Sequence, residues 1–460
     1  MPSKIDVGPV YTFDPRDRAK YGRDFRPVER ELVFDVDLTD YDDVRVCGSG
    51  GHICRRCWPL MAAAVEVMDL TLRRDFGFRH VLWVYSGRRG VHGWVCDAGA
   101  RGMADEVRAA LVGFCSVYRG TEAGEGGGGG GGGHESGGGG GGGAPASAPV
   151  ARVRLATGAT RHPSVERAYL TLRRAWETKV LPAQGLLDGP ETWARVLQYV
   201  PEDDGGSNGG GGNGGGGGAR GALAKAWSAG KLLHGGGGGA GAAGAPCLSV
   251  ARWHDLVAEV ERAAARAARA GGPGGGGGAG GGGGAGGGAG GAAAPSGRAR
   301  AAALNRAVPD IVLAFTYPRL DVEVSKKMNH LLKAPFCVHP KTGRVCVPLD
   351  PARVWEFDPE ATEAPSTGGG GGGGGNGGGG NGGDYAPRVT DLLAQAALAQ
   401  QQGRGAPGQA WRETGLAPSL RYFEEGFLAP LAAEARAALT AGSKAAGAAA
   451  AAEGAAGLAW

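Results

Sequence analysis

Several features that would direct a chain to a membrane or to the secretory pathway are absent from these 460 residues. No apolar run reaches the length of about 18 residues that a membrane-spanning helix needs. The opening residues MPSKIDVG contain no apolar core of the signal-peptide type. Cysteine is scarce, and eight residues in a chain of this length do not form a disulfide framework. We therefore expect a reducing compartment, in which cysteines bind metal or stay buried as thiols.

A strong excess of charge is also missing, because the formal net charge is only +4. The chain as a whole is not basic enough for its composition to indicate nucleic-acid binding. Any anion-binding role must come from local clusters of cations.

Glycine is the residue in excess, with 94 copies, most of them in five tracts. These tracts are 124–143, 205–218, 235–245, 271–292 and 367–383. Near-pure glycine has no side chains to bury and loses the most backbone entropy on folding, so we expect disordered insertions in surface loops. The alanine-rich end, 431–460, is compatible with a helix or with a tail.

Strand and helix patterns alternate in the first quarter of the chain. Residues 31–38, ELVFDVDL, alternate with period two, and residues 58–75 carry an apolar helical stripe. Two apolar runs, 80–85 and 91–96, flank a short turn, and a second helical stripe covers 107–118. This β-α-β-β-α order predicts an α/β fold in which helices pack against a mixed sheet.

The middle of the chain predicts a helical lobe. Residues 162–200 and 247–270 have helical patterns, and strand character returns at 311–324 and continues through 336–348. The chain is therefore expected to leave a sheet domain, form a helical insertion and come back to the sheet.

Three aspartates are candidate metal ligands. Asp35 and Asp37 lie on one face of the strand 31–38, with Cα atoms roughly 6.6 Å apart at ~3.3 Å per residue. Two such carboxylates repel unless a cation lies between them, and two-metal sites hold ions about 3.5–4 Å apart. A solvated strand face produces the same pattern, so both interpretations stay open. Asp321, in the predicted strand segment PRLDVEVSK, is a candidate third carboxylate, with Glu323 as its rival.

The turn SGRRGVH, residues 86–92, combines cations with glycine. Guanidinium groups bind two phosphate oxygens at once, and glycine lets backbone N–H groups approach the same anion. The later block HLLKAPFCVHP adds Lys333 and His339. Each of these residues alone is better explained as a surface charge or a satisfied histidine. Together with the aspartates they predict carboxylates for metal beside a cationic cup for phosphates, as nucleotidyl transfer requires.

A cysteine pattern suggests a second metal site. Cys47, Cys54 and Cys57 form C-x6-C-x2-C in CGSGGHICRRC, and thiolates in a short glycine-rich loop favour Zn²⁺. Three cysteines leave a tetrahedral site one ligand short.

These motifs, in this order, resemble the small catalytic subunit of eukaryotic DNA primase, of the archaeo-eukaryotic primase superfamily. The resemblance rests on ELVFDVDLTDYDDVRVC, CRRCWPLM, DFGFRHVLWVYSGRRGVHGWVCD, YPRLDVEVSKKMNHLLKAPF and VHPKTGRVCVPLD. A weaker similarity covers TGLAPSLRYFEEGFL at 414–428, and the helical lobe matches only loosely.

The resemblance implies a role for each candidate residue. Asp35, Asp37 and Asp321 would hold two catalytic Mg²⁺ or Mn²⁺ ions. The cationic cup that would bind the triphosphate of the incoming nucleotide comprises Ser86, Arg88, Arg89, His92, Lys333 and His339. The implied activity is DNA-templated synthesis of short RNA primers from ribonucleoside triphosphates. The implied partners are a DNA template, the primase large subunit and the DNA polymerase α complex, in the nucleus and without membrane association.

The resemblance also implies a prim catalytic fold with an inserted helical subdomain and a zinc knuckle. The expected divisions are 1–155 (first catalytic part, with the knuckle at 47–57 and the tract 124–143), 156–304 (helical insertion), 305–366 (second catalytic part), 367–383 (disordered tract) and 384–460 (C-terminal helical segment and alanine-rich tail).

Three departures from the family pattern bear on function. The family knuckle normally has adjacent cysteines where this chain has Cys47 and Gly48, so we expect His52 to complete a Cys₃His zinc site. Gly93 replaces a cysteine common in the family. The chain also begins well inside the usual N-terminal region, which implies a truncated gene model or weaker nucleotide binding. Lys4 is retained and is expected to face the nucleotide.

Two alternative functions stay open at this point. One is a primase-polymerase of the same superfamily that acts in damage tolerance. The other is a truncated, non-catalytic subunit that serves as a scaffold for the large subunit.

Overall fold

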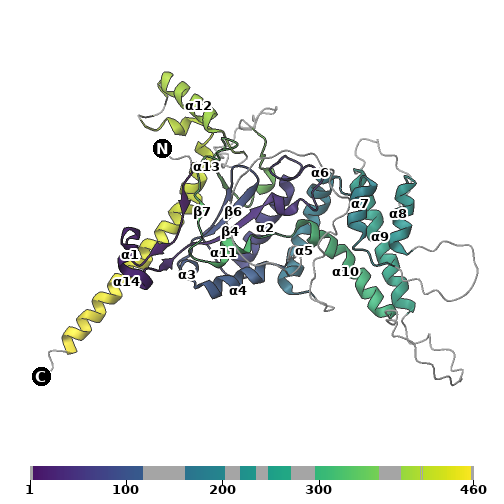
Figure 1. The fold of residues 1–460 in the computed structure, drawn as a ribbon, viewed down its shortest axis with the longest axis horizontal. Coiled ribbons are helices and arrows are strands. Elements are labelled where there is room, and N and C mark those ends of the chain that lie inside the picture. Colours follow the sequence, from purple (N-terminus) through teal and green to yellow (C-terminus); the bar gives the residue numbers. More distant parts are fainter. Residues whose placement is uncertain are drawn as a thin grey trace, which may run out of the picture. The chain divides into compact units, whose positions relative to one another are not determined.

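A computed structural model provides the fold (Figure 1). The residues it describes are 4–117, 161–202, 218–234, 247–270, 296–361, 385–404, 406 and 408–456, with side chains up to residue 444. The expected disordered tracts fall outside the described residues, except for Gly218. The chain divides into two compact units: unit 1 takes 1–40, 48–116 and 318–460, and unit 2 takes 41–47 and 117–317.

Unit 1 is built on a four-stranded sheet in the order β4-β6-β5-β8. Its strands are β4 (Leu32–Asp37), β6 (Gly90–Val95), β5 (Val81–Tyr85) and β8 (Pro348–Leu349). All three pairings are antiparallel, so the expectation of a mixed sheet was wrong in this respect. The reason is local, because the short connection between β5 and β6 forms a hairpin, and a hairpin joins only antiparallel strands. The combination of helices with a sheet is as expected.

Helix α2 (Trp58–Arg74) packs against β5 and β6. Its Trp58 ring meets Tyr85 of β5 edge-on, with centroids 5.8 Å apart, and the Trp58 indole N–H donates to the carbonyl of Val354 at 2.7 Å. Apolar residues of α2 recur on the buried side, which is why the stripe at 58–75 forms a helix.

A second apolar cluster contains Val33, Val84 and Trp94 of the sheet together with Val324 and Phe427. Side chains alternate along a strand, so Asp35 and Asp37 share a face with Val33. The predicted site residues of β4 therefore lie beside a packed core rather than on an open, solvated strand face.

The remaining elements of unit 1 are short, apart from three helices. The strands are β1 (Asp6–Val7), β2 (Val10–Tyr11), β3 (Pro27–Glu29) and β7 (Leu332–Lys333). The α-helices are α1 (Arg18–Tyr21), α3 (Ala98–Arg101), α4 (Asp105–Cys115), α11 (Val322–Lys326), α12 (Val389–Gln401), α13 (Ala417–Arg421) and α14 (Ala429–Ala456). The other helical turns are η1 (Pro15–Asp17), η2 (Gly22–Asp24), η3 (Leu38–Tyr41), which runs one residue into unit 2, η5 (Val354–Glu356), η6 (Ala410–Glu413) and η7 (Tyr422–Leu428). Of the two readings of the alanine-rich end, the helix is the one observed as far as Ala456.

Every regular element of unit 2 that lies in the described residues is helical. They are α5 (Pro163–Ala175), η4 (Trp176–Val180), α6 (Leu181–Gln184), α7 (Pro190–Leu197), α8 (Ala219–Ser228), α9 (Leu248–Ala270) and α10 (Gly297–Thr316). The ring of Trp176 lies at the centre of the packing, 5.4 Å from Trp253 and 5.7 Å from Phe315 between centroids. The helical patterns at 162–200 and 247–270 are confirmed.

Two strand predictions were wrong. Residues 311–316 belong to helix α10, and residues 322–324 begin helix α11, so 311–324 contains no strand. The run IVLAFT is buried on all sides, and an apolar run without periodicity fits a buried helix as well as a buried strand. The stretch 336–348 forms two isolated bridges, Val338 with Val345 and Arg344 with Arg388, and the first residue of β8.

In the part of the chain that the structure describes, no helix combines the length and the apolar character needed to cross a bilayer.

Candidate functional site

Three predicted carboxylates come together in unit 1. Asp35 and Asp37 lie on β4, where they pair with His92 and Gly90 of β6. Asp321 is the N-cap of α11 rather than a strand residue, and its backbone N–H donates to the carbonyl of Asp35 at 3.0 Å. This main-chain bond holds the start of α11 against β4.

The rival residue Glu323 is engaged elsewhere. Its carboxylate accepts a hydrogen bond from Lys326 at 2.8 Å, and 63% of its side chain is exposed. Its backbone N–H donates to Asp321 Oδ1 at 3.1 Å, which fixes the Asp321 carboxylate at the helix start. The geometry therefore favours Asp321 over Glu323 as the third member.

The carboxylates are crowded. Burial raises the pKa of Asp35 to about 7, assisted by the negative charges of Asp37, Asp321 and Asp40, while Lys333 opposes the shift. Burial and the charges of Asp37 and Asp321 likewise raise the pKa of Asp40 to about 6. Mutual repulsion of this kind is relieved by a bound cation.

Asp40 was not predicted as a member of this group, because it lies beyond the alternating strand 31–38 in an acidic stretch with Asp42 and Asp43. The short helix η3 keeps it near Asp37 and Asp321, which is a tertiary effect. Its main-chain carbonyl also accepts a hydrogen bond from the guanidinium of Arg319. We call Asp35, Asp37, Asp40 and Asp321 the acidic cluster.

Asp37 is held by three hydrogen bonds. Arg89 Nε donates to Asp37 Oδ2 at 2.7 Å, and the N–H and hydroxyl of Thr39 donate to Asp37 Oδ1 at 2.9 and 2.8 Å. Arg89 therefore links the acidic cluster to the cationic cup. Part of its positive charge is balanced by Asp37.

Two hydrogen bonds and close packing hold the hairpin turn between β5 and β6. The N–H of Gly90 donates to Ser86 Oγ at 3.0 Å, and the hydroxyl of Tyr85 donates to the carbonyl of Arg88 at 2.7 Å. Gly87 has φ of +85°, and a Cβ there would lie 2.8 Å from the Cβ of His339. Glycine at this position thus permits close packing of the turn against His339.

Lys333 and His339 complete the cup. Lys333 Nζ donates to the carbonyl of Ser86 at 2.8 Å. Burial lowers the pKa of His339 to about 4, and the positive charges of Lys333, Arg88, Arg89 and Lys341 lower it further. The shift shows that several cations surround this imidazole, and Lys341 is one that the sequence patterns did not single out.

His92 is buried at the boundary between the two groups. Its Nε2 lies 3.7 Å from Asp35 Oδ1. Burial and the charge of Lys333 lower its pKa to about 3, so the imidazole is neutral at pH 7. It offers hydrogen bonding without adding positive charge.

The guanidinium of Arg88 makes no hydrogen bond or ion pair within the described residues. It lies against the loop that precedes the C-x2-C pair, because a Cβ placed on Gly51 would be 1.9 Å from its terminal nitrogen. Arg88 is therefore positioned by packing against this loop rather than by hydrogen bonds, and its N–H groups are available to a ligand.

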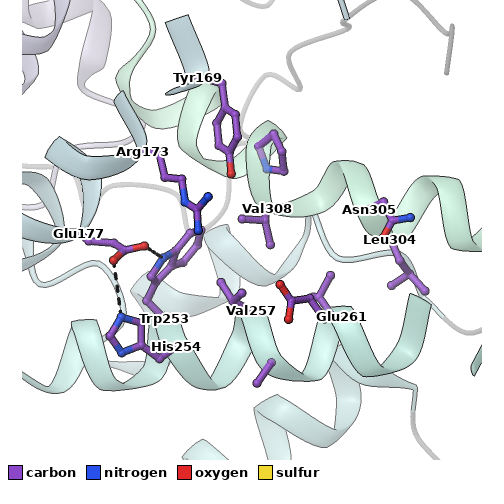
Figure 2. Close-up of a pocket in the computed structure, with 13 residues that line it drawn as sticks. Tyr169, Arg173, Glu177, Trp253, His254, Val257, Glu261, Leu304, Asn305 and Val308 are labelled. Atoms are coloured by element: carbon purple, nitrogen blue, oxygen red, sulfur yellow. Dashed lines mark hydrogen bonds and ion pairs between the residues drawn. The ribbon is translucent and has the colours of Figure 1, made fainter. Parts of the chain in front are cut away.

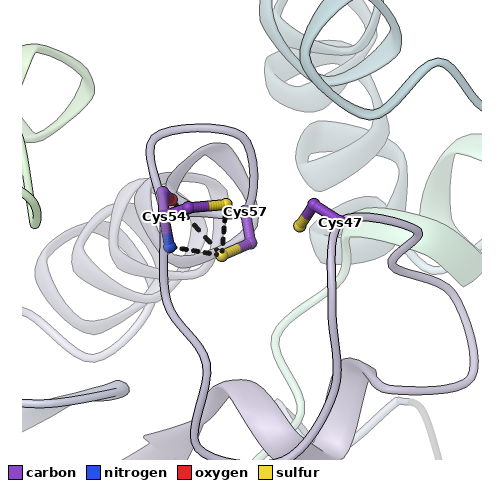
Figure 3. A group of neighbouring side chains, drawn as sticks. All are labelled: Cys47, Cys54 and Cys57. Carbon is purple, nitrogen blue, oxygen red and sulfur yellow. Dashed lines mark hydrogen bonds between the residues drawn. The ribbon is translucent and has the colours of Figure 1, made fainter.

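The three cysteines of the predicted knuckle also converge (Figure 3). Their sulfur atoms all lie within 4.8 Å of one another. The N–H of Cys54 donates to Cys57 Sγ at 3.1 Å, and the two sulfurs are 3.6 Å apart. Three converging thiols suit a soft metal such as Zn²⁺. His52 is exposed and lies outside this group, so its role as fourth ligand stays a prediction.

A separate cavity of about 460 Å³ lies in unit 2 between α5, α9 and α10 (Figure 2). In it, Glu177 accepts a hydrogen bond from the Trp253 indole at 3.2 Å and lies 3.6 Å from His254 Nε2. No predicted site residue lines this cavity. The candidate site is therefore the acidic cluster with the cationic cup in unit 1.

Comparison with known proteins identifies related chains. A family model described as DNA primase small subunit matches residues 34–351, a region that contains every candidate from Asp35 to His339. The DNA primase small subunit of Schizosaccharomyces pombe is 34% identical over 361 residues, 78% of this chain and 61% of the relative. Its counterparts in Drosophila melanogaster and Saccharomyces cerevisiae are 33% identical over 358 residues and 27% identical over 350 residues. These alignments cover 78% and 76% of this chain, and 64% and 65% of the relatives. The chain thus spans less than two thirds of the length of these three relatives.

Proposed function

The chain belongs to the DNA primase small subunit family, and on this premise we propose that it synthesises short RNA primers on a DNA template from ribonucleoside triphosphates. The observation that carries the proposal is the main-chain hydrogen bond from the Asp321 N–H to the Asp35 carbonyl, because it holds the start of α11, which bears Asp321, against the strand that bears Asp35 and Asp37. Neither alternative function, a damage-tolerance primase-polymerase or a non-catalytic scaffold, is favoured by the family match.

Asp35, Asp37 and Asp321 are proposed to hold two divalent ions, Mg²⁺ or Mn²⁺. Carboxylate oxygens are the ligands that these hard cations prefer. The fit is supported by the crowding that raises the pKa of Asp35, which bound cations would relieve. When bound, the ions would lower the pKa of the attacking 3′-hydroxyl and neutralise charge on the departing phosphates.

The cationic cup binds the triphosphate in this proposal. Arg88 contributes a guanidinium that has no other partner among the described residues, and Lys333 contributes an ammonium next to the turn. His92 is neutral and donates to a phosphate oxygen, while Arg89 holds Asp37 in the orientation that faces the nucleotide. Ser86 and His339 shape the cup where the turn packs.

The reaction that this arrangement serves is one substitution at phosphorus. The 3′-oxygen of the primer end bonds to the α-phosphorus of the incoming nucleotide. The bond between the α-phosphorus and the bridging oxygen to the β-phosphorus breaks, and pyrophosphate leaves. The hydroxyl proton passes to solvent.

The knuckle is proposed to hold a structural Zn²⁺ through Cys47, Cys54 and Cys57, with His52 as the candidate fourth ligand. Unit 2 is proposed to be the inserted helical subdomain of the prim fold. As proposed partners we name the DNA template, the primase large subunit and the DNA polymerase α complex, and as compartment the nucleus.

The test is primer synthesis on poly(dT) with ATP and Mn²⁺, with and without the large subunit. We expect RNA products that Asp35→Asn abolishes. Absence of products from the wild-type chain, with an intact large subunit present, would support the scaffold alternative instead.

A further inference from the structure

Residues 10–29 form a small projecting lobe of unit 1, which we call the N-terminal lobe. It consists of β2 and β3 with η1, α1 and η2 between them. None of its residues is buried. Two ring stacks hold it together: Tyr11 lies on Phe25 at 4.4 Å and 10°, and Phe13 lies on Tyr21 at 3.7 Å and 7°. Its aromatic surface is therefore partly accessible, and 38% of Phe13 is exposed.

The lobe carries five exposed cations, which are Arg16, Arg18, Lys20, Arg23 and Arg26. Within the described residues, none of the five is in an ion pair. Lys20 lies 5.0 Å from the Tyr21 ring and Arg18 lies 6.0 Å from the Phe25 ring, so two of the cations extend the stacked rings. The lobe also contains four acids, Asp14, Asp17, Asp24 and Glu29, of which Asp14 caps η1 and Glu29 pairs with Arg101 at 3.0 Å. The lobe therefore keeps a local excess of positive charge in a chain whose net charge is only +4.

The lobe is attached close to the cationic cup. Residues 8 and 9 join it to β1, and β1 pairs with β7, where Asp6 stands opposite Lys333. Three residues of chain span at most about 11 Å, which is the length of roughly three base-pair steps. A nucleic acid whose primer end lies at the acidic cluster would therefore reach the lobe within a few nucleotides.

We propose that the N-terminal lobe is a contact surface for the phosphate backbone of the template and primer next to the site. The proposal rests on the polymerase function proposed above. Cations interleaved with accessible stacked rings are the equipment of proteins that hold nucleic-acid strands without reading their sequence. An acidic protein surface is the competing partner, and the experiment separates the two.

The test compares three chains by fluorescence anisotropy with a labelled RNA primer on a DNA template, over a series of salt concentrations. The variant is Arg16→Gln with Arg23→Gln and Arg26→Gln, which leaves both ring stacks and both ring-bound cations in place. The control is Arg174→Gln with Arg269→Gln and Arg298→Gln, three exposed arginines of unit 2 that remove the same charge.

Each lost phosphate contact reduces the slope of log K against log salt by about 0.7 on a single strand and about 0.9 on a duplex, so we expect the variant's slope to fall by about 2–3. The control slope stays at the wild-type value, and the KM for ATP at saturating template stays unchanged in both variants. A variant slope equal to that of wild type would overturn the proposal. If the variant's affinity for the large subunit then falls, the lobe binds a protein surface instead. Failure of the polymerase proposal is distinct, because the wild-type chain would then make no primer at all.

Discussion

The backbone N–H of Asp321 donates to the backbone carbonyl of Asp35 at 3.0 Å, which ties the first residue of the α11 cap to the centre of β4. The bond uses main-chain atoms on both sides. It therefore persists when either side chain is changed, and substitutions of these carboxylates should report on their chemistry rather than on folding.

Asp321→Asn is expected to lower primer synthesis by at least about 100-fold, as loss of a group that stabilises developing charge does elsewhere. Its melting temperature should change by less than about 2 °C. The matched control is Glu323→Gln on the same short helix, which should keep wild-type activity because Glu323 pairs with Lys326. Comparable losses in both variants would remove Asp321 from the proposed set of metal ligands.

Arg88→Ala should raise the KM for nucleotide without destabilising the chain. Charged hydrogen bonds contribute about 1.5–3 kcal/mol, which corresponds to roughly a 10- to 100-fold rise in KM. The guanidinium has no hydrogen bond within the described residues, so thermal denaturation should show no loss of stability. A large fall in melting temperature would mean that the arginine is structural.

Gly51→Ala tests whether the loop before the C-x2-C pair positions Arg88. An added Cβ would lie 1.9 Å from the Arg88 terminal nitrogen, and the flexible end of that side chain can move away at little cost. We expect a higher KM for nucleotide with an unchanged melting temperature. Gly99→Ala is the control, because a Cβ there meets nothing within 4 Å. An unchanged KM in Gly51→Ala would show that the loop does not position Arg88.

Cys54→Ser should lower the zinc content of the protein if the knuckle binds zinc as proposed, because the sulfurs of Cys54 and Cys57 lie side by side in the group with Cys47. The measurement is zinc content by a chromogenic chelator, together with the melting temperature, which should fall.

The role of His52 is tested separately by X-ray absorption, since three sulfurs and one nitrogen would support it as a ligand. Four sulfurs, or full zinc content in His52→Ala, would exclude it.

The stability of unit 2 should depend on the protonation of Asp310. Burial raises its pKa to about 6, although the charges of Arg161 and Arg306 oppose the shift. A carboxyl with a raised pKa in the folded state destabilises that state progressively as pH rises from about 4 to about 6, and fully above that. Asp310→Asn should therefore be more stable than wild type at pH 7 by about 1–3 kcal/mol, but not at pH 4.

Urea denaturation at the two pH values measures this difference. The partly buried Asp391→Asn, in unit 1, serves as the control and should leave the pH profile of unit 2 stability unchanged. If the stability of Asp310→Asn changes with pH as that of wild type does, the pH dependence does not come from Asp310.

Local patterns were enough to predict one half of the site. Alternation along β4 places Asp35 and Asp37 on one face, and the glycine-containing turn between two apolar runs predicts the hairpin that carries Arg88. Asp321 was assigned to a strand because buried apolar runs have no clear period. Its true place depends on a main-chain bond between distant segments, which no local pattern encodes.

Contacts between distant segments, which local patterns do not encode, also bear on the other residues of the site. Asp40 enters the acidic cluster through a short helix whose direction is set by tertiary packing. His52, two residues before Cys54, is exposed and lies outside the group of three cysteine sulfurs, and its role as fourth ligand stays a prediction. The resemblance to a known family supplied the activity and partners, which composition and periodicity alone do not indicate.

The three stretches of unit 1 are separated in the sequence by the whole of unit 2. A ribosome delivers β4 and its hairpin early, and it delivers Asp321, β7 and β8 only after the helical unit has been made. A nascent chain therefore carries two aspartates without the third, and the centre is completed last, by contacts of long sequence separation that form slowly.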